Sequence, residues 1–164
     1  MYEYSIDDIM DMLSWKKSEK VQQKGIELSK GIKSINVFIK PLNPENGWDA
    51  WDNCAKVLAS KSDDLLNPYI FQLLEWLADI MKPGALIIYK RLRSFSKTDG
   101  LFSSAFELCA KEAIADKDVL WLGALAGLLN GNETMKPILN TKLSEVIVST
   151  LQDHYENFEW LNEE

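Results

Sequence analysis

Histidine and cysteine are scarce in this chain of 164 residues, which contains one histidine, His154, and two cysteines, Cys54 and Cys109. A zinc site built from cysteine and histidine needs several ligands at short spacing, and these three residues do not supply them. Catalysis by a Ser-His-Asp or Cys-His group would have to use His154, and the sequence contains no nucleophile-elbow motif that would supply the nucleophile. We therefore expect no catalytic residue, no metal and no cofactor, and we predict that the protein is not an enzyme.

Long apolar runs and a cationic leader are also missing. The longest apolar stretch covers residues 119–129, whereas a helix that spans a bilayer needs about 20 residues. The first fifteen residues contain Glu3 and three aspartates but no basic residue, the opposite of a secretory signal. Two cysteines without a CxxC pair suit a reducing compartment as free buried thiols, although their spacing alone does not exclude a disulfide. We expect a cytoplasmic protein that does not act at a membrane.

Basic residues are in the minority, with 18 lysines and arginines against 25 acidic residues, so the net charge is −7. This balance argues against a general nucleic-acid binder, which must neutralise phosphates. The hydrophobic fraction of 46% and the charged fraction of 26% are typical of one soluble globular domain. We therefore expect a single α-helical domain over residues 1–164.

The apolar residues recur with helical periodicity, and no stretch alternates as a half-buried strand would. The clearest helix is predicted to begin at Asn67-Pro68, with one apolar stripe formed by Ile70, Leu73, Leu74, Leu77 and Met81. Lys82-Pro83-Gly84 then ends it, because the residue before a proline avoids helical geometry. The next helix, from Pro83 to Phe95, should pack antiparallel to the first as a hairpin.

Other helices are predicted from caps and periodicity. Ser5 and Asp8 form a capping-box pattern, and Ser18 and Ser34 are further candidate caps. Gly123 and Gly127 should allow close helix packing within the core. The predicted helices cover Ser5 to Leu13, Glu19 to Ile32, Ile35 to Lys40, Trp48 to Ala59, Leu101 to Ala115, Asp118 to Leu129 and Thr141 to Leu161.

The helix starts recur at a nearly constant interval. Helices starting at 48, 84 and 118 are separated by 36 and 34 residues, and those starting at 68, 102 and 141 by 34 and 39. Helix pairs of the HEAT and armadillo kind repeat at about 35–47 residues. The pattern predicts an all-α, HEAT/armadillo-like fold in which antiparallel helix hairpins form a short right-handed solenoid. An irregular helical bundle is the alternative.

The segment from Trp51 to Phe95 contains four short motifs: Asn53-Cys54-Ala55-Lys56, Ser60-Lys61-Ser62-Asp63, the run 73–79 (LLEWLAD), and Pro83-Gly84-Ala85. With these motifs the segment resembles a group of small bacterial helical proteins, and the likeness extends over about residues 5–95. The resemblance implies a HEAT-like fold. It also implies a function, since many of these proteins are regarded as immunity proteins that neutralise toxins of polymorphic or contact-dependent inhibition systems. It brings no catalytic residues with it.

Negative charge is concentrated at the end of the chain. The last twenty residues contain six acids and no lysine or arginine, so they carry six of the seven net negative charges. Such a surface beside apolar side chains attracts a basic partner and accelerates encounter. The predicted partner-binding residues are Glu145, Asp153, Glu156, Glu159 and, as an apolar anchor, Trp160. An acidic end that serves only solubility is an equally good interpretation.

The remaining carboxylate pairs and tryptophans have ordinary structural interpretations. Asp63 and Asp64 suit the first turn of a helix, and Glu75 and Asp79 suit a solvated face. Trp76 and Trp121 are predicted in the core. Trp48, Trp51 and Trp160 are left open between core and interface roles.

The favoured function is a stoichiometric immunity protein that binds a basic, nuclease-type toxin domain. A cytoplasmic scaffold for another protein is the alternative, and a HEAT-like enzyme that modifies nucleic acid is a third. That enzyme would need a basic concave surface, for which this composition gives little room. The oligomeric state is left open.

Overall fold

The computed structural model describes residues 3–43, 47–98, 100–132, 134–135 and 141–152, and every regular element in this part is helical. The prediction of an all-α protein is thus confirmed for these residues. None of the helices described there has the length and apolar character needed to cross a membrane. The α-helices are α1 (Ile6–Met12), α2 (Glu19–Ser29), α3 (Trp51–Ala59), α4 (Asp63–Leu66), α5 (Ile70–Trp76), α6 (Ala85–Arg93), α7 (Leu101–Ala115), α8 (Val119–Gly131) and α9 (Thr141–Gln152).

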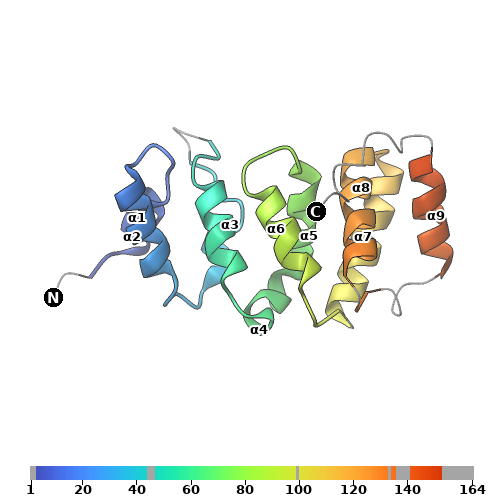
Figure 1. Ribbon diagram of the computed structural model, residues 1–164, viewed down its shortest axis with the longest axis horizontal. Helices are drawn as coiled ribbons and strands as arrows, with labels where there is room; N and C mark the ends of the chain where they lie inside the picture. The colour runs from blue at the N-terminus through green and yellow to red at the C-terminus, as the bar shows by residue number, and fades with distance from the viewer. Residues whose placement is uncertain (1–2, 44–46, 99, 133, 136–140, 153–164) are drawn as a thin grey trace.

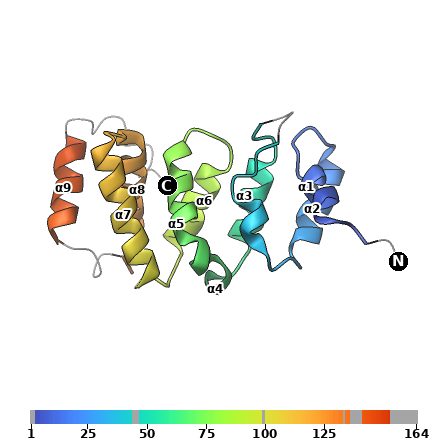
Figure 2. The ribbon, with the colours of Figure 1, turned by 180° about the vertical axis from the view of Figure 1, so that it is seen from behind.

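The helices stand side by side in one row, with α1 and α2 at one end and α9 at the other (Figures 1 and 2). Helix α3 packs on α6, and α6 on α8, which gives one layer. Helix α5 packs on α7, and α7 on α9, which gives the second layer. Helices α5 and α6 run antiparallel, as expected for a hairpin (Figure 1).

A continuous apolar core runs between the layers. Its largest fully buried side chains include Trp76, Phe38, Phe95, Phe102 and Phe106. Burial of each such side chain contributes about 1.5–3 kcal/mol, so the helix stripes hold the row together. Trp121 is also buried, so both tryptophans predicted in the core are there.

The two cysteines are free and buried, as the sequence predicted. Burial raises the pKa of the Cys109 thiol to about 12, and it also raises the pKa of Cys54. Both thiols therefore stay neutral at physiological pH and are packing groups rather than nucleophiles.

The helix expected from Asn67 to Met81 is interrupted in the structure. Helix α4 begins at Asp63, because the Ser62 side chain accepts a hydrogen bond from the Leu65 N–H. The 3-10 turns η2 (Asn67–Tyr69) and η3 (Leu77–Asp79) flank α5. A 3-10 turn advances about 120° per residue instead of 100°. Residues after the turn therefore no longer lie on the same face as the apolar stripe before it. Ile80 is buried, and Met81, expected on the stripe, is 76% exposed.

The other helix bounds follow the sequence with local differences. The capping box of Ser5 and Asp8 is present, and Ser18 caps α2 as expected. Ser34 makes no capping bond, and residues 35–38 form the 3-10 turn η1. Helix α3 begins at Trp51 rather than Trp48, after a turn. The predicted end of the last helix, residues 153–161, lies outside the described residues.

Gly127 marks a close approach between α8 and α6. A Cβ atom there would lie 2.5 Å from the Tyr89 hydroxyl oxygen, which leaves no room for any larger residue without movement. The close packing predicted for this glycine is confirmed.

The connections between helices form two opposite edges of the row. The upper edge in Figure 1 contains residues 13–18, 39–43, 47–50 and 80–84, and the lower edge contains residues 30–34, 60–62, 94–98 and 134–135. These two edges differ in the large apolar side chains that they expose.

Polar side chains tie the lower edge together. The Lys61 ammonium, on a residue that is 6% exposed, donates to the carbonyl oxygens of Ser29, Lys30 and Ile32 at 2.8–3.0 Å, which caps the end of α2. Asn132 caps the end of α6 in the same way, donating to the carbonyl oxygens of Leu92 at 2.9 Å and Phe95 at 2.8 Å. These bonds satisfy carbonyl groups that a helix end leaves without intrahelical donors.

Candidate functional site

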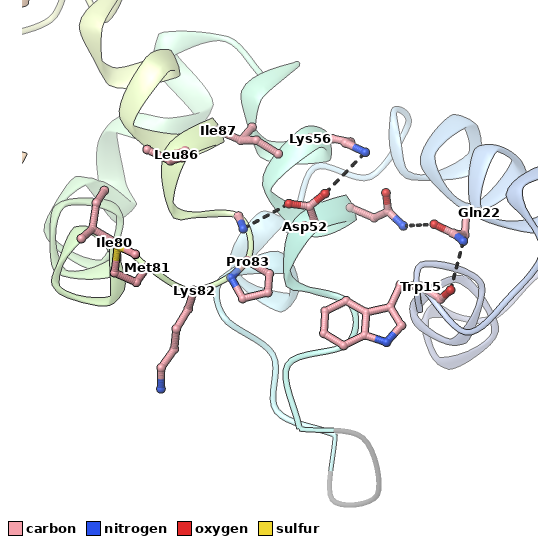
Figure 3. Close-up of a pocket in the computed structure, with 12 residues that line it drawn as sticks. Trp15, Gln22, Asp52, Lys56, Ile80, Met81, Lys82, Pro83, Leu86 and Ile87 are labelled. Carbon is pink, nitrogen blue, oxygen red and sulfur yellow. Dashed lines mark hydrogen bonds and ion pairs between the residues drawn. The ribbon is translucent and has the colours of Figure 1, made fainter. Parts of the chain in front are cut away.

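A groove of about 750 Å³ opens on the upper edge, over α3 and between the α1–α2 connection and the start of α6 (Figure 3). Its walls come from segments that are far apart in the sequence. The residues that line it are Trp15, Gln22, Asp52, Asn53, Lys56, Ile80, Met81, Lys82, Pro83, Gly84, Leu86 and Ile87.

Large apolar side chains border this groove in contact with solvent. Trp15 is 46% exposed, Met81 76% and Leu86 45%. The Trp15 backbone N–H donates to the Asp49 carbonyl oxygen at 3.1 Å, which ties the α1–α2 connection to the segment before α3. The indole therefore lines the groove from a fixed backbone.

Hydrogen bonds between elements make the floor of the groove rigid. The Asn53 side chain donates to the Leu13 carbonyl oxygen and to the Gln22 side-chain oxygen, both at 2.8 Å. The Gln22 amide in turn donates to the Lys17 carbonyl oxygen at 2.7 Å. These bonds hold α3, α2 and the α1–α2 connection in one arrangement.

The charged groups of the floor are also engaged. One Asp52 oxygen accepts the Gly84 N–H at 3.2 Å, and the other lies 3.6 Å from the Lys56 ammonium (Figure 3). What the groove offers to a ligand is therefore mainly shape and apolar surface.

Gly84 fixes the connection that forms one wall. Its φ of 84° lies in the left-handed region, and a Cβ atom there would lie 2.7 Å from the Trp51 carbonyl oxygen and 2.8 Å from the Trp76 ring. Only glycine fits this turn without strain. The Pro-Gly-Ala motif thus places Lys82 and Pro83 at the rim.

A line of three tryptophans leads from the rim into the core. Trp48 is 38% exposed, and the Lys82 ammonium lies 4.2 Å from the centroid of its ring. The Trp51 ring is 6.0 Å from Trp48 and 5.7 Å from Trp76, and both Trp51 and Trp76 are buried. The structure therefore places Trp51 in the core and Trp48 at the surface.

The acidic site predicted from the sequence is mostly outside the described part of the chain. Glu145 is exposed on α9, at the other end of the row from the groove (Figure 1). Asp153, Glu156, Glu159 and Trp160 are not among the described residues. Their role as a partner-binding surface stays a prediction.

The carboxylate pairs singled out in the sequence have structural partners. Asp63 pairs with Arg91 at 2.6 Å and accepts bonds from the Ser96 N–H at 3.0 Å and the Ser96 hydroxyl at 2.6 Å. Glu75 and Asp79, expected on a solvated face, lie 3.8 and 3.4 Å from the Lys40 ammonium. Across the described residues, no group of three or more histidine, cysteine, aspartate or glutamate side chains could hold a metal ion.

Sequence reasoning missed the exposed apolar residues of the groove. Trp15 had a usable signal, because it follows the predicted end of a helix at Leu13 and precedes two lysines. A tryptophan in a polar connection has no helix stripe that would bury it. Met81 and Leu86 had no such signal, since their exposure depends on the 3-10 turn before them and on how α6 is placed.

No protein-family model, no curated protein and no solved structure matches this chain.

Proposed function

We propose that the protein is a non-catalytic binding module of HEAT-like helix hairpins, an immunity protein that neutralises a basic bacterial toxin domain by stoichiometric binding. The observation that carries the binding role is the groove itself, an open space of about 750 Å³ bordered by exposed Trp15, Met81 and Leu86. Tryptophan and methionine are enriched at protein interfaces, and tryptophan above all at their hot spots.

The packing of the helices supports the HEAT-like part of the proposal. The first helices of the expected pairs, α3, α6 and α8, contact one another in succession, and so do the second helices, α5, α7 and α9. Stacked helix hairpins pack in this way, each pair burying its apolar face on the next. Lys61, which follows α3, caps α2, and Asn132, which follows α8, caps α6. The same kind of hydrogen bond thus connects neighbouring helix pairs at two places in the row.

The charge distribution supports a basic partner. The chain has a net charge of −7, and its acids include three aspartates of α1, which has no basic residue, as well as the six acids of the last twenty residues. A surface of one sign steers an oppositely charged partner and raises its association rate. Nuclease-type toxin domains are basic, because they must bind phosphates.

The residues that carry the family resemblance have structural roles in this protein. Trp76 lies in the core, Gly84 forms the turn at the groove wall, and Lys61 caps α2. These three residues of the motifs therefore support the fold, whereas Asn53, Lys56 and Pro83 of the same motifs line the groove.

Co-expression with the protein encoded beside it, scored as rescue of growth, tests the proposal directly. The wild-type protein should restore growth, and the double variant Trp15→Ala/Leu86→Ala should lose at least about tenfold in affinity, because hot-spot truncations cost about 2 kcal/mol or more. Leu108→Ala is the matched control, since Leu108 is 59% exposed on α7 and lies outside the groove.

Two results would count against the proposal. A neighbouring protein that is neither toxic nor bound by the wild-type chain would exclude the immunity function. A correctly folded double variant that still protects as well as Leu108→Ala would exclude the groove as the binding surface.

The acidic end needs a separate test. Reversal of Glu156 and Glu159 to lysine should lower the association rate most strongly at low salt, without unfolding the domain. Association kinetics at about 20 and 200 mM salt measure the effect. Unchanged rates at both salt concentrations would assign the acidic end to solubility.

A further inference from the structure

Asp49 is the one residue of the upper edge whose carboxylate is both buried and incompletely paired within the described residues. It is 2% exposed, and its Oδ2 atom has no hydrogen-bond partner. A buried carboxylate oxygen without a donor is unfavourable, so native proteins rarely keep one without a reason. Asp49 is one of the residues that line a second pocket of about 300 Å³, between α1 and the segment before α3.

Two more carboxylates line the same pocket, Asp7 and Asp11 of α1. Asp11 lies 2.9 Å from the Lys17 ammonium, which neutralises one of the three charges. Within the described part of the chain, no lysine or arginine pairs with Asp7 or Asp49. The pocket thus has an excess of negative charge and room for a cationic group.

The other walls are apolar. Met10, Pro41 and Leu42 line the pocket, and Leu42 is 74% exposed at its side. Carboxylates beside apolar walls match a long basic side chain, whose methylene stem packs on apolar surface while its charged end meets the acids. Arginine suits this site better than lysine, because its guanidinium is more weakly hydrated and binds carboxylates through two parallel hydrogen bonds.

We propose that this pocket receives an arginine side chain of the basic partner, with the guanidinium on Asp49 and Asp7 and the stem on Leu42. The proposal rests on the proposed function, and it names the residue type by which the partner is recognised. The pocket adjoins the groove, since the Trp15 N–H donates to the Asp49 carbonyl oxygen at 3.1 Å. A protein docked over Trp15 is therefore within reach of the pocket.

The test is a titration of the full ¹⁵N-labelled chain with N-acetyl-L-arginine amide, followed by two-dimensional NMR. Saturable shifts are expected for the backbone amides of Asp11, Ser14, Asp49 and Ala50. N-acetyl-citrulline amide, which has the same shape without the charge, should produce none. Asp49→Asn should weaken binding at least about tenfold, whereas Glu112→Gln, an exposed acid on α7, should leave it unchanged.

A thermal melt separates a binding role of Asp49 from a structural one. Removal of a buried charge that lacks a partner should leave the melting temperature of Asp49→Asn equal to that of the wild type or above it. A lower melting temperature combined with undiminished binding of the arginine amide would overturn the proposal. It would show that the carboxylate serves the fold alone.

Three other outcomes would also overturn it. The first is the absence of saturable shifts with the arginine amide. The second is tighter binding of Mg²⁺ or Ca²⁺ at the same amides, which would make the pocket a cation site. The third is tighter binding of free L-arginine than of its capped form, which would indicate a small-molecule site. None of these measurements needs the partner protein, so a failed growth rescue and a failed titration are distinguishable.

Discussion

The two edges of the molecule differ in the side chains that they expose. On the lower edge, Lys61, Asn132 and the Asp63–Arg91–Ser96 group all bond to atoms of neighbouring elements. On the upper edge, the groove exposes Trp15 and Met81, and Asp49 keeps a buried oxygen without a donor. Polar side chains tie neighbouring elements together at both edges, as Asn53 and Asp52 do beside the groove. The upper edge differs in the apolar side chains that it exposes, and it is the surface that we propose for a partner.

Two residues on the lower edge show that a side chain does not need a charge to cap the end of a helix. Lys61 and Asn132 both cap the end of a helix from a later element, one with an ammonium and the other with an amide. Charged residues there are part of the fold. In the complex that we propose, specificity comes from the side chains of the upper edge.

The largest effect on stability is expected at Gly84, where the upper edge is as tightly packed as the core. Gly84→Ala should lower the free energy of unfolding by about 3 kcal/mol or more, because strain at positive φ and overpacking each cost about 1–3 kcal/mol. Urea denaturation measures the change. Gly31→Ala is the control, since a Cβ atom there meets nothing within 4 Å, and its effect should stay below about 1 kcal/mol.

Lys61→Met is expected to have the next largest effect and tests the lower edge. The variant keeps an unbranched apolar side chain but leaves the carbonyl oxygens of Ser29, Lys30 and Ile32 without this donor. The loss should be about 2–3 kcal/mol, since a single buried unsatisfied group costs about 1–3 kcal/mol. A loss below about 1 kcal/mol for Lys61→Met in chemical denaturation would contradict a structural role for this ammonium.

Asp63 provides a pH-dependent test of the same edge. Burial by itself would raise the pKa of Asp63, but the hydrogen bonds from Ser96 and Arg91 outweigh it and hold the pKa below the ordinary value of 3.8. Because the folded-state pKa is lower than the unfolded-state pKa, Asp63 adds stability above about pH 4 that is lost as the pH falls through the folded-state pKa.

Asp63→Asn should therefore lower stability by about 2 kcal/mol at neutral pH and reduce the change in stability between about pH 5 and pH 3. Asp64→Asn is the neighbouring control, because Asp64 pairs with Lys97 through a side chain that is itself 76% exposed. Exposed pairs contribute about 0–1 kcal/mol. Equal pH profiles for the wild type and Asp63→Asn would show that the Asp63 group does not stabilise the fold.

Trp15→Ala should have the smallest effect on stability. Its side chain is half-exposed, so the loss should stay near 1 kcal/mol, against about 3–5 kcal/mol for Trp51→Ala in the core. Thermal or urea unfolding of the two variants makes the comparison. A loss for Trp15→Ala as large as that for Trp51→Ala would place Trp15 in the core and remove the main argument for the groove.

Several parts of the structure could be predicted because their causes are local. The capping box of Ser5 and Asp8, the break at Pro83-Gly84 and the helix from Leu101 to Ala115 each depend on neighbouring residues alone. The helix over 67–81 was predicted as continuous, which is wrong, because the turns around α5 depend on contacts with other elements. Met81 was misplaced for the same reason.

The candidate site was less predictable than the fold. The sequence pointed to acids near the C-terminus, of which only Glu145 is described, and it gave no sign that Asp49 lines a pocket with two aspartates of α1. Those residues are about forty positions apart in the chain, and no periodicity relates them. Trp15 alone could have been noticed, because a large aromatic residue stood in a polar connection.

Local chemistry is thus what the sequence determined by itself: helical periodicity, caps, breaks and an excess of acid. Only the tertiary structure decided which side chains are left on the surface, because exposure depends on how the layers pack. An apolar stripe predicts which face of a helix is buried, but it does not predict which connections between helices lie together at one edge of the molecule. The groove and the acidic pocket exist because α1, α3 and α6 bring their ends together there.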